Sequence, residues 1–236
     1  MFGLDIACNA ASALYFFPLN ILLDNRMGLD DSTRLRIYEI YSREMINIHL
    51  GQGMDIVWQS GKADMQAIGE LDYMQMGALK TGTLPRLAAR LGAALCKADK
   101  AVEIHLAEFA ESLGIGFQIY DDVLNLTCSN GKNQFTSEYL GSDISEGKIS
   151  LIIIHAIKQG IRIKRLQEII SLHTRDKSLI DEAIAILRRN GSIEYAAARS
   201  KSIIHEGWNK LHAFFHDCGD IRMLDEFVEF INRRDH

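Results

Sequence analysis

Two adjacent carboxylates stand in a mostly apolar helical run, Gly116–Asn125. On a helix, Gln118, Asp121, Asp122 and Asn125 occupy positions i, i+3, i+4 and i+7 and therefore share one face. Neighbouring carboxylates repel each other, and a hard cation such as Mg²⁺ relieves that repulsion while it also binds substrate phosphate oxygens. The pattern predicts that Asp121 and Asp122 are metal ligands. The alternative is a solvent-exposed acidic pair near a helix end, against which the apolar neighbours argue.

Two lysines lie beside glycines where helices are expected to end or begin. Lys80 belongs to a Lys-Thr-Gly break, and Lys148 closes the segment 141–148, which also carries Asp143. A lysine ammonium is a compact charge that suits a phosphate group, so both lysines are candidate diphosphate ligands, with Asp143 near the metal. Simpler explanations stay open, because Lys80 also suits a helix C-terminus and 141–148 also suits a helix N-cap.

A fourth cluster, 51–55, places two glycines inside an expected helix. Glycine within a helix costs about 1 kcal/mol relative to alanine, so Gly51 and Gly53 indicate the close approach of a ligand or of another backbone. Gln52 and Asp55 lie one helical turn apart in the same cluster. Tight helix packing without a ligand explains these glycines equally well.

The composition excludes several classes of protein. The 236 residues are 47% hydrophobic and 24% charged, as in ordinary globular proteins. A net charge of -5 without a dense Lys/Arg stripe argues against nucleic-acid binding. The four cysteines show no close pairing, which predicts reduced thiols in the cytoplasm rather than a zinc site or a disulfide scaffold. The apolar stretches 10–23 and 151–157 are too short to span a bilayer, and we interpret both as buried helices, without stable membrane insertion.

Nearly every segment shows a helical period, and only two prolines interrupt the chain. Helices are expected over 31–58, 64–79, 83–95, 100–126, 149–161, 165–172, 177–189, 193–216 and 221–233, with 128–141 as a loop. Asp30 and Asp64 provide N-cap signals. Since no run alternates long enough for a sheet, the predicted architecture is an all-α bundle of roughly eight to ten helices, a single domain over 1–236.

The four clusters occur in the order GQxxD, KTGxL, FQIxDDxxN and GSDIxEGK. In this order they resemble the trans-prenyl diphosphate synthases of the polyprenyl synthetase family, and the opening segment 2–10 is similar to that family's helix after its first aspartate motif. The resemblance covers almost the whole chain and is closest to the farnesyl and geranylgeranyl types. Asn125, in place of a last aspartate, resembles the geranylgeranyl variants. The fold implied is the isoprenoid-synthase-type helical bundle.

The resemblance implies a Mg²⁺-dependent prenyltransferase that joins an allylic diphosphate to isopentenyl diphosphate. The implied site residues are Gln52, Asp55, Lys80, Thr81, Gln118 and Lys148, with Asp121 and Asp122 as metal ligands. Lys80 and Lys148 would contact the allylic diphosphate, while Thr81 and Gln118 would present oxygens to the allylic cation. Members of the family are usually homodimers, so a homo- or hetero-dimer is expected, with the helix at 5–23 near the interface.

One departure from the family pattern concerns its first aspartate motif. The sequence contains neither that DDxxD cluster nor the Gly-Gly-Lys-x-x-Arg segment that precedes it in the family, and Asp30 and Asp31 lie too late to substitute. We therefore expect this chain alone to bind magnesium and diphosphate weakly and to be nearly inactive, because the catalytic set would be completed by further sequence or by a second chain.

Three alternatives to an active prenyltransferase follow from this departure and from the shared fold. The first two are a regulatory subunit of a heteromeric synthase and a truncated, inactive fragment. The retained Lys80 and Lys148 argue against a pure scaffold. The third is a class I terpene cyclase, whose second metal motif does not occur in the sequence.

Overall fold

The computed structural model describes residues 3–127, 140–160, 163–215, 223–226 and 228. These residues form helices and connecting turns, and no strand occurs among them, which confirms the predicted all-α fold. The helices are α1 Leu4–Leu14, α2 Leu19–Asp24, α3 Asp31–Gln59, α4 Glu70–Lys80, α5 Thr83–Leu95, α6 Lys100–Thr127, α7 Ser142–Glu146, α8 Leu151–Gln159, α9 Ile163–Ser171, α10 Lys177–Arg189 and α11 Ser192–Phe214.

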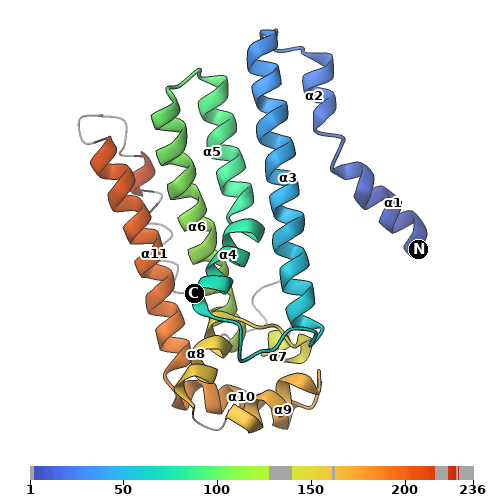
Figure 1. Ribbon diagram of the computed structural model, residues 1–236, viewed down its shortest axis with the longest axis vertical. Coiled ribbons are helices and arrows are strands. Elements are labelled where there is room, and N and C mark those ends of the chain that lie inside the picture. The colour runs from blue at the N-terminus through green and yellow to red at the C-terminus, as the bar shows by residue number, and fades with distance from the viewer. Residues whose placement is uncertain (1–2, 128–139, 161–162, 216–222, 227, 229–236) are drawn as a thin grey trace.

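The long helices lie side by side along the longest axis of the molecule (Figure 1). Helix α6 is flanked by α11 and α5, and α3 packs against α4 and α5. The short helices α7 to α10 gather at the end of the bundle where α3 and α6 finish (Figure 1). The C-terminal halves of α3 and α6 are therefore brought to the same end of the molecule as α7 and α8.

Most helix limits agree with the sequence predictions to within two residues, because the caps are local. At the start of α3, for example, the Asp30 carboxylate accepts a hydrogen bond from the Thr33 N–H at 2.9 Å. The segments 128–139 and 229–233, parts of the predicted loop and last helix, lie outside the described residues.

The predicted start of the second helix at residue 64 is wrong. The Asp64 carboxylate accepts from the Gln66 N–H at 2.9 Å and closes a turn, while α4 begins only at Glu70. The Gly69 N–H donates to the Asp72 carboxylate at 2.7 Å, which provides the cap that the helix uses. Two acidic cap signals within nine residues made the sequence ambiguous, because an Asp side chain stabilises a turn as readily as a helix N-terminus.

The two apolar stretches that were interpreted as buried helices differ in the structure. The stretch 151–157 lies in α8, and all of it except the half-buried His155 is buried in the main core. The stretch 10–23 is not buried, since α1 contains no buried residue and α2 buries only Leu22. Figure 1 shows α1 standing apart from the bundle, so its apolar side chains face outward in this chain.

A network of ion pairs links α3, α5 and α6 through the fully buried Glu44 of α3. Its carboxylate accepts from Arg86 at 2.6 Å and from Arg90 at 2.8 Å, both on α5. Arg90 also donates to Glu103 of α6, which pairs with Arg36 of α3 at 2.7 Å. Burial alone would raise the pKa of Glu103, but hydrogen bonds from its cationic neighbours lower that pKa to about 2. Three helices are thus joined by charges that compensate one another.

None of the helices in the described ranges is long and apolar enough to cross a membrane.

Candidate functional site

The predicted site residues meet at the end of the bundle where α4, α6 and α7 come together. The Thr81 hydroxyl donates to the Gln118 amide oxygen at 2.6 Å, and the Gln118 amide nitrogen donates to Asp122 at 3.0 Å. The Lys148 ammonium donates to Asp122 at 2.7 Å. Residues from three of the four sequence clusters, separated by as many as 67 positions between Thr81 and Lys148, therefore form one hydrogen-bonded chain.

Asp122 lies at the centre of this chain and is 1% exposed. One carboxylate oxygen accepts from both Lys148 and Gln118, and the other accepts from the Tyr73 hydroxyl at 2.8 Å. Its neighbour Asp121 is exposed. The two adjacent carboxylates that sequence alone made equivalent therefore occupy different environments, one buried inside the protein and one exposed at the surface.

Lys148 joins Asp122 to Asp143 of α7, whose carboxylate accepts from the same ammonium at 3.0 Å. Burial would lower the pKa of Lys148, but the two carboxylates raise it above its usual value, so the side chain stays cationic. Burial also raises the pKa of Asp143. The Lys148 ammonium lowers this pKa and the Asp122 carboxylate raises it, and the net result is a pKa of about 6. The group thus concentrates charge in a partly desolvated place, as is frequent at functional sites.

Lys80 ends α4 and forms an ion pair with Asp55 of α3, with the ammonium 2.5 Å from Oδ2. Asp55 is buried, and its Oδ1 has no hydrogen-bond partner among the described residues. This contact brings the fourth sequence cluster to the same place, because Lys80 directly precedes Thr81 in the chain. Gln52, the other predicted residue of that cluster, is exposed.

The two glycines of the 51–55 cluster have different surroundings. A Cβ atom on Gly51 would lie 2.5 Å from the backbone nitrogen of Lys80, so only glycine lets α3 approach the end of α4 this closely. A Cβ atom on Gly53 would meet nothing within 4 Å. The predicted close approach of another backbone or a ligand is thus confirmed for Gly51, where the backbone of α4 comes close, whereas no other part of the described chain approaches Gly53.

Tyr73 is a site residue that the sequence predictions missed. It lies on α4, seven residues before Lys80 and therefore on the same helix face, and its side chain is among the most buried in the described structure. Burial raises the pKa of its hydroxyl well above the usual value, and the Asp122 carboxylate adds to that effect. The phenol thus stays protonated and donates to Asp122. The i, i+7 relation to Lys80 was the only signal for it in the sequence.

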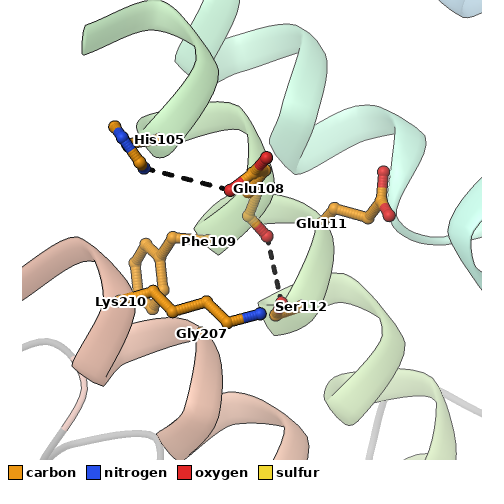
Figure 2. A pocket seen from close by; sticks show the side chains of 7 residues that line it. All are labelled: His105, Glu108, Phe109, Glu111, Ser112, Gly207 and Lys210. Carbon is orange, nitrogen blue, oxygen red and sulfur yellow. Dashed lines mark hydrogen bonds and ion pairs between the residues drawn. The ribbon is translucent and has the colours of Figure 1, made fainter. Parts of the chain in front are cut away.

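A separate hollow of about 230 Å³ lies between α6 and α11 (Figure 2). Acidic and basic side chains line it, among them Glu108, Glu111 and Lys210. None of the predicted site residues belongs to its lining, and it therefore does not contribute to the hydrogen-bonded chain described above.

Comparison with known proteins gives consistent matches along most of the chain. The family model described as polyprenyl synthetase matches residues 1–187. A geranylgeranyl pyrophosphate synthase of Aspergillus flavus is 28% identical over 98% of this chain and 63% of its own length. A geranylgeranyl diphosphate synthase of Methanosarcina mazei is 30% identical over 86% of this chain and 59% of its own. The chain thus spans about three fifths of the length of these curated relatives.

Solved structures give the same picture. The geranylgeranyl pyrophosphate synthetase from the archaeon Geoglobus acetivorans superimposes with a TM-score of 0.78 at 27% identity, covering 99% of this chain and 69% of that one.

Proposed function

The chain belongs to the polyprenyl synthetase family, and on that basis we propose that it acts as a prenyltransferase of the short-chain, geranylgeranyl type. In this reaction the carbon–oxygen bond of an allylic diphosphate breaks, and the leaving diphosphate keeps the electron pair. The double bond of isopentenyl diphosphate attacks the allylic cation, a carbon–carbon bond forms, and a proton is lost to the departing diphosphate. The names of the relatives support the geranylgeranyl type.

The single observation that carries this proposal is the hydrogen-bonded chain from Thr81 through Gln118 and Asp122 to Lys148. It places an oxygen at the end of α4, another within α6 and a cation after α7 beside one another, held by a buried carboxylate. Such a preorganised set needs little rearrangement when charge develops on a substrate, which is the principal requirement for electrostatic catalysis.

Lys80 and Lys148 are the proposed diphosphate ligands. Each ammonium carries three N–H donors, and its contacts within the described part of the chain occupy one donor of Lys80 and two of Lys148. Each lysine therefore retains a donor for a phosphate oxygen. Their carboxylate partners hold both ammonium groups in position, and the two carboxylates beside Lys148 raise its pKa.

Thr81 and Gln118 are the proposed oxygen donors toward the allylic cation. Because the Gln118 amide nitrogen donates to Asp122, its oxygen must face Thr81. The Thr81 hydroxyl donates its only proton to that oxygen, which leaves the lone pairs of its own oxygen available. Both oxygens are thereby oriented by bonds that begin at the buried Asp122.

The residues present fit magnesium that is shared with substrate phosphates. No group of three or more His, Cys, Asp or Glu side chains in the described part of the chain is arranged to hold a metal by itself. Mg²⁺ commonly binds one or two carboxylates together with phosphate oxygens and water. We propose Asp121 as the first ligand because it is exposed to solvent and follows Gln118 by one helical turn on α6, whereas Asp122 is buried. Magnesium bound there would stabilise the charge that the diphosphate gains as it leaves.

Incubation with radiolabelled isopentenyl diphosphate tests the proposed activity. Dimethylallyl, geranyl and farnesyl diphosphate are supplied in separate tubes with magnesium. We expect a low yield of extended prenyl product with at least one of them, because the sequence contains no first DDxxD motif. The product should disappear in the Asp121→Ala variant and after removal of magnesium by a chelator. Absence of product with all three allylic substrates would contradict the proposal for this chain.

A second subunit is proposed to cover the outward apolar faces of α1 and α3. Leu4 of α1 and Ile46 and Leu50 of α3, one turn apart, are all exposed. The turn after α1 lies on α3, because the Tyr41 hydroxyl donates to the Tyr15 carbonyl. An exposed apolar surface that runs over neighbouring helices is typical of a subunit interface. The usual homodimers of the family support the same assignment.

Light scattering measures this assembly directly. The wild-type chain, with a subunit mass of 26.6 kDa, should have about twice that mass in solution. The double variant Ile46→Glu, Leu50→Glu should be monomeric, whereas Leu172→Glu, at an exposed apolar residue after α9, should leave the mass unchanged. A monomeric wild-type chain would exclude the homodimer.

A further inference from the structure

Helix α7 is a five-residue segment that carries Asp143 and begins without a capping side chain of its own. Its N-cap residue is Gly141, which adopts φ +78° and forms no side-chain hydrogen bond. A Cβ atom there would lie 2.4 Å from Ile180, so no larger residue fits without a shift of that side chain. The first N–H groups of a helix have no intrahelical partner, and α7 therefore depends on another element for them.

Asn125 of α6 provides these partners. Its amide oxygen accepts from the Asp143 N–H at 3.2 Å, and its amide nitrogen donates to the buried Ser142 hydroxyl at 2.7 Å. Its backbone carbonyl accepts from the Gly141 N–H at 2.9 Å. Asn125 thus contacts three consecutive residues, namely the cap Gly141 and the first two residues of α7. It uses both polar atoms of its side chain to do so.

Helix α7 in turn determines where the lysine lies. The Lys148 N–H donates to the Asp143 carbonyl at 3.0 Å, and the Lys148 ammonium donates to the Asp143 carboxylate. We propose that Asn125 is a positioning residue, which anchors α7 to α6 and thereby holds Asp143 and Lys148 beside Asp122. This inference rests on the proposed function only where it assigns the diphosphate to Lys148.

The amide has a chemical advantage at this position. Asn125 is one helical turn after Asp121, close to the carboxylates of Asp122 and Asp143. A neutral side chain supplies a hydrogen-bond acceptor for α7 without adding a further negative charge to three carboxylates. Its oxygen already accepts from a backbone N–H, so we assign Asn125 to α7 rather than to the metal.

Hydrogen exchange of the full chain tests this role without relying on activity. In Asn125→Ala, exchange of the Asp143 amide and its neighbours in 141–148 should rise about tenfold, while exchange in α3 and α5 stays unchanged. Asn125→Asp should exchange more slowly than Asn125→Ala, because a carboxylate can accept from both the Asp143 N–H and the Ser142 hydroxyl, and faster than wild type, because it adds a negative charge beside three carboxylates. Thr127→Ala is the matched control, since among the described residues that hydroxyl donates to the Val123 carbonyl of its own helix.

Two results would overturn the inference: unchanged exchange in Asn125→Ala, or exchange in Asn125→Asp as fast as in Asn125→Ala. If Asn125→Ala does not fold, Ser142→Ala removes one of the same hydrogen bonds and should accelerate exchange in the same segment, and no acceleration there would also overturn it.

Calorimetric titration with pyrophosphate in the presence of magnesium then connects α7 to the ligand. Asn125→Ala should bind about tenfold more weakly than wild type, and Thr127→Ala within about twofold. If wild type binds no pyrophosphate, the proposed function fails while the exchange experiment still decides the role of Asn125. If wild type binds and Asn125→Ala binds equally well, positioning of Lys148 by Asn125 is refuted.

Discussion

Replacement of Lys148 by alanine is expected to weaken binding of magnesium pyrophosphate by roughly 10- to 150-fold. A hydrogen bond to a charged group is worth about 1.5–3 kcal/mol, which corresponds to this range in affinity. The variant also leaves Asp122 and Asp143 without their shared cation, so two carboxylates would repel the incoming diphosphate. Isothermal titration calorimetry against wild type measures the change.

One further variant separates the charge of Lys148 from its packing, and a second serves as a control. Lys148→Gln keeps a hydrogen-bond donor without the charge and should lose most of the same affinity. Lys164→Ala removes an exposed lysine of α9 and should bind within about twofold of wild type. If Lys148→Ala binds pyrophosphate as tightly as wild type while its circular dichroism is unchanged, Lys148 is not a diphosphate ligand.

Replacement of Glu44 by alanine is expected to have the largest effect on stability. Glu44 is fully buried between Arg86 and Arg90, and its loss leaves both guanidinium groups without their shared carboxylate. Removing one partner of a buried ion pair typically costs about 3–5 kcal/mol, because the remaining charge stays desolvated. For a chain of this size the expected fall in melting temperature is roughly 6–20 °C.

Thermal unfolding followed by circular dichroism checks this result. Glu39→Ala is the matched control on the same helix, since Glu39 is exposed and pairs with Arg36 at 3.4 Å. Its melting temperature should change by no more than about 4 °C, as for most surface ion pairs. A melting temperature for Glu44→Ala that equals the control would mean that the two arginines find other partners or water.

Glu44 and Asp55 link stability to function through α3. Glu44 helps to hold α5 on α3, and Asp55, eleven residues later on α3, pairs with Lys80 at the end of α4. Since α4 carries Tyr73 as well as Lys80, the position of α3 affects both the ion pair and the hydroxyl that contacts Asp122. We therefore expect changes in the Glu44 network to affect the site indirectly, through helix packing.

The sequence alone determined the helical class, most helix limits and the four polar clusters. Helix caps such as Asp30 act within one turn, and a period of 3.6 residues places Gln118, Asp121, Asp122 and Asn125 on one face whatever surrounds them. The order of the clusters along the chain was sufficient for the family resemblance. These features depend on neighbours that are close in sequence, and for that reason they are legible without a structure.

Only the tertiary structure decided what the members of each cluster do. Asp122 turns inward because Tyr73, 49 positions away, and Lys148 donate to it, while the adjacent Asp121 is exposed. Glu44 meets Arg86 across 42 positions, and α1 turned out to be exposed although its sequence is as apolar as a core helix. Such roles depend on which distant helix lies opposite a residue, because a buried polar group is stable only where another element supplies its partner.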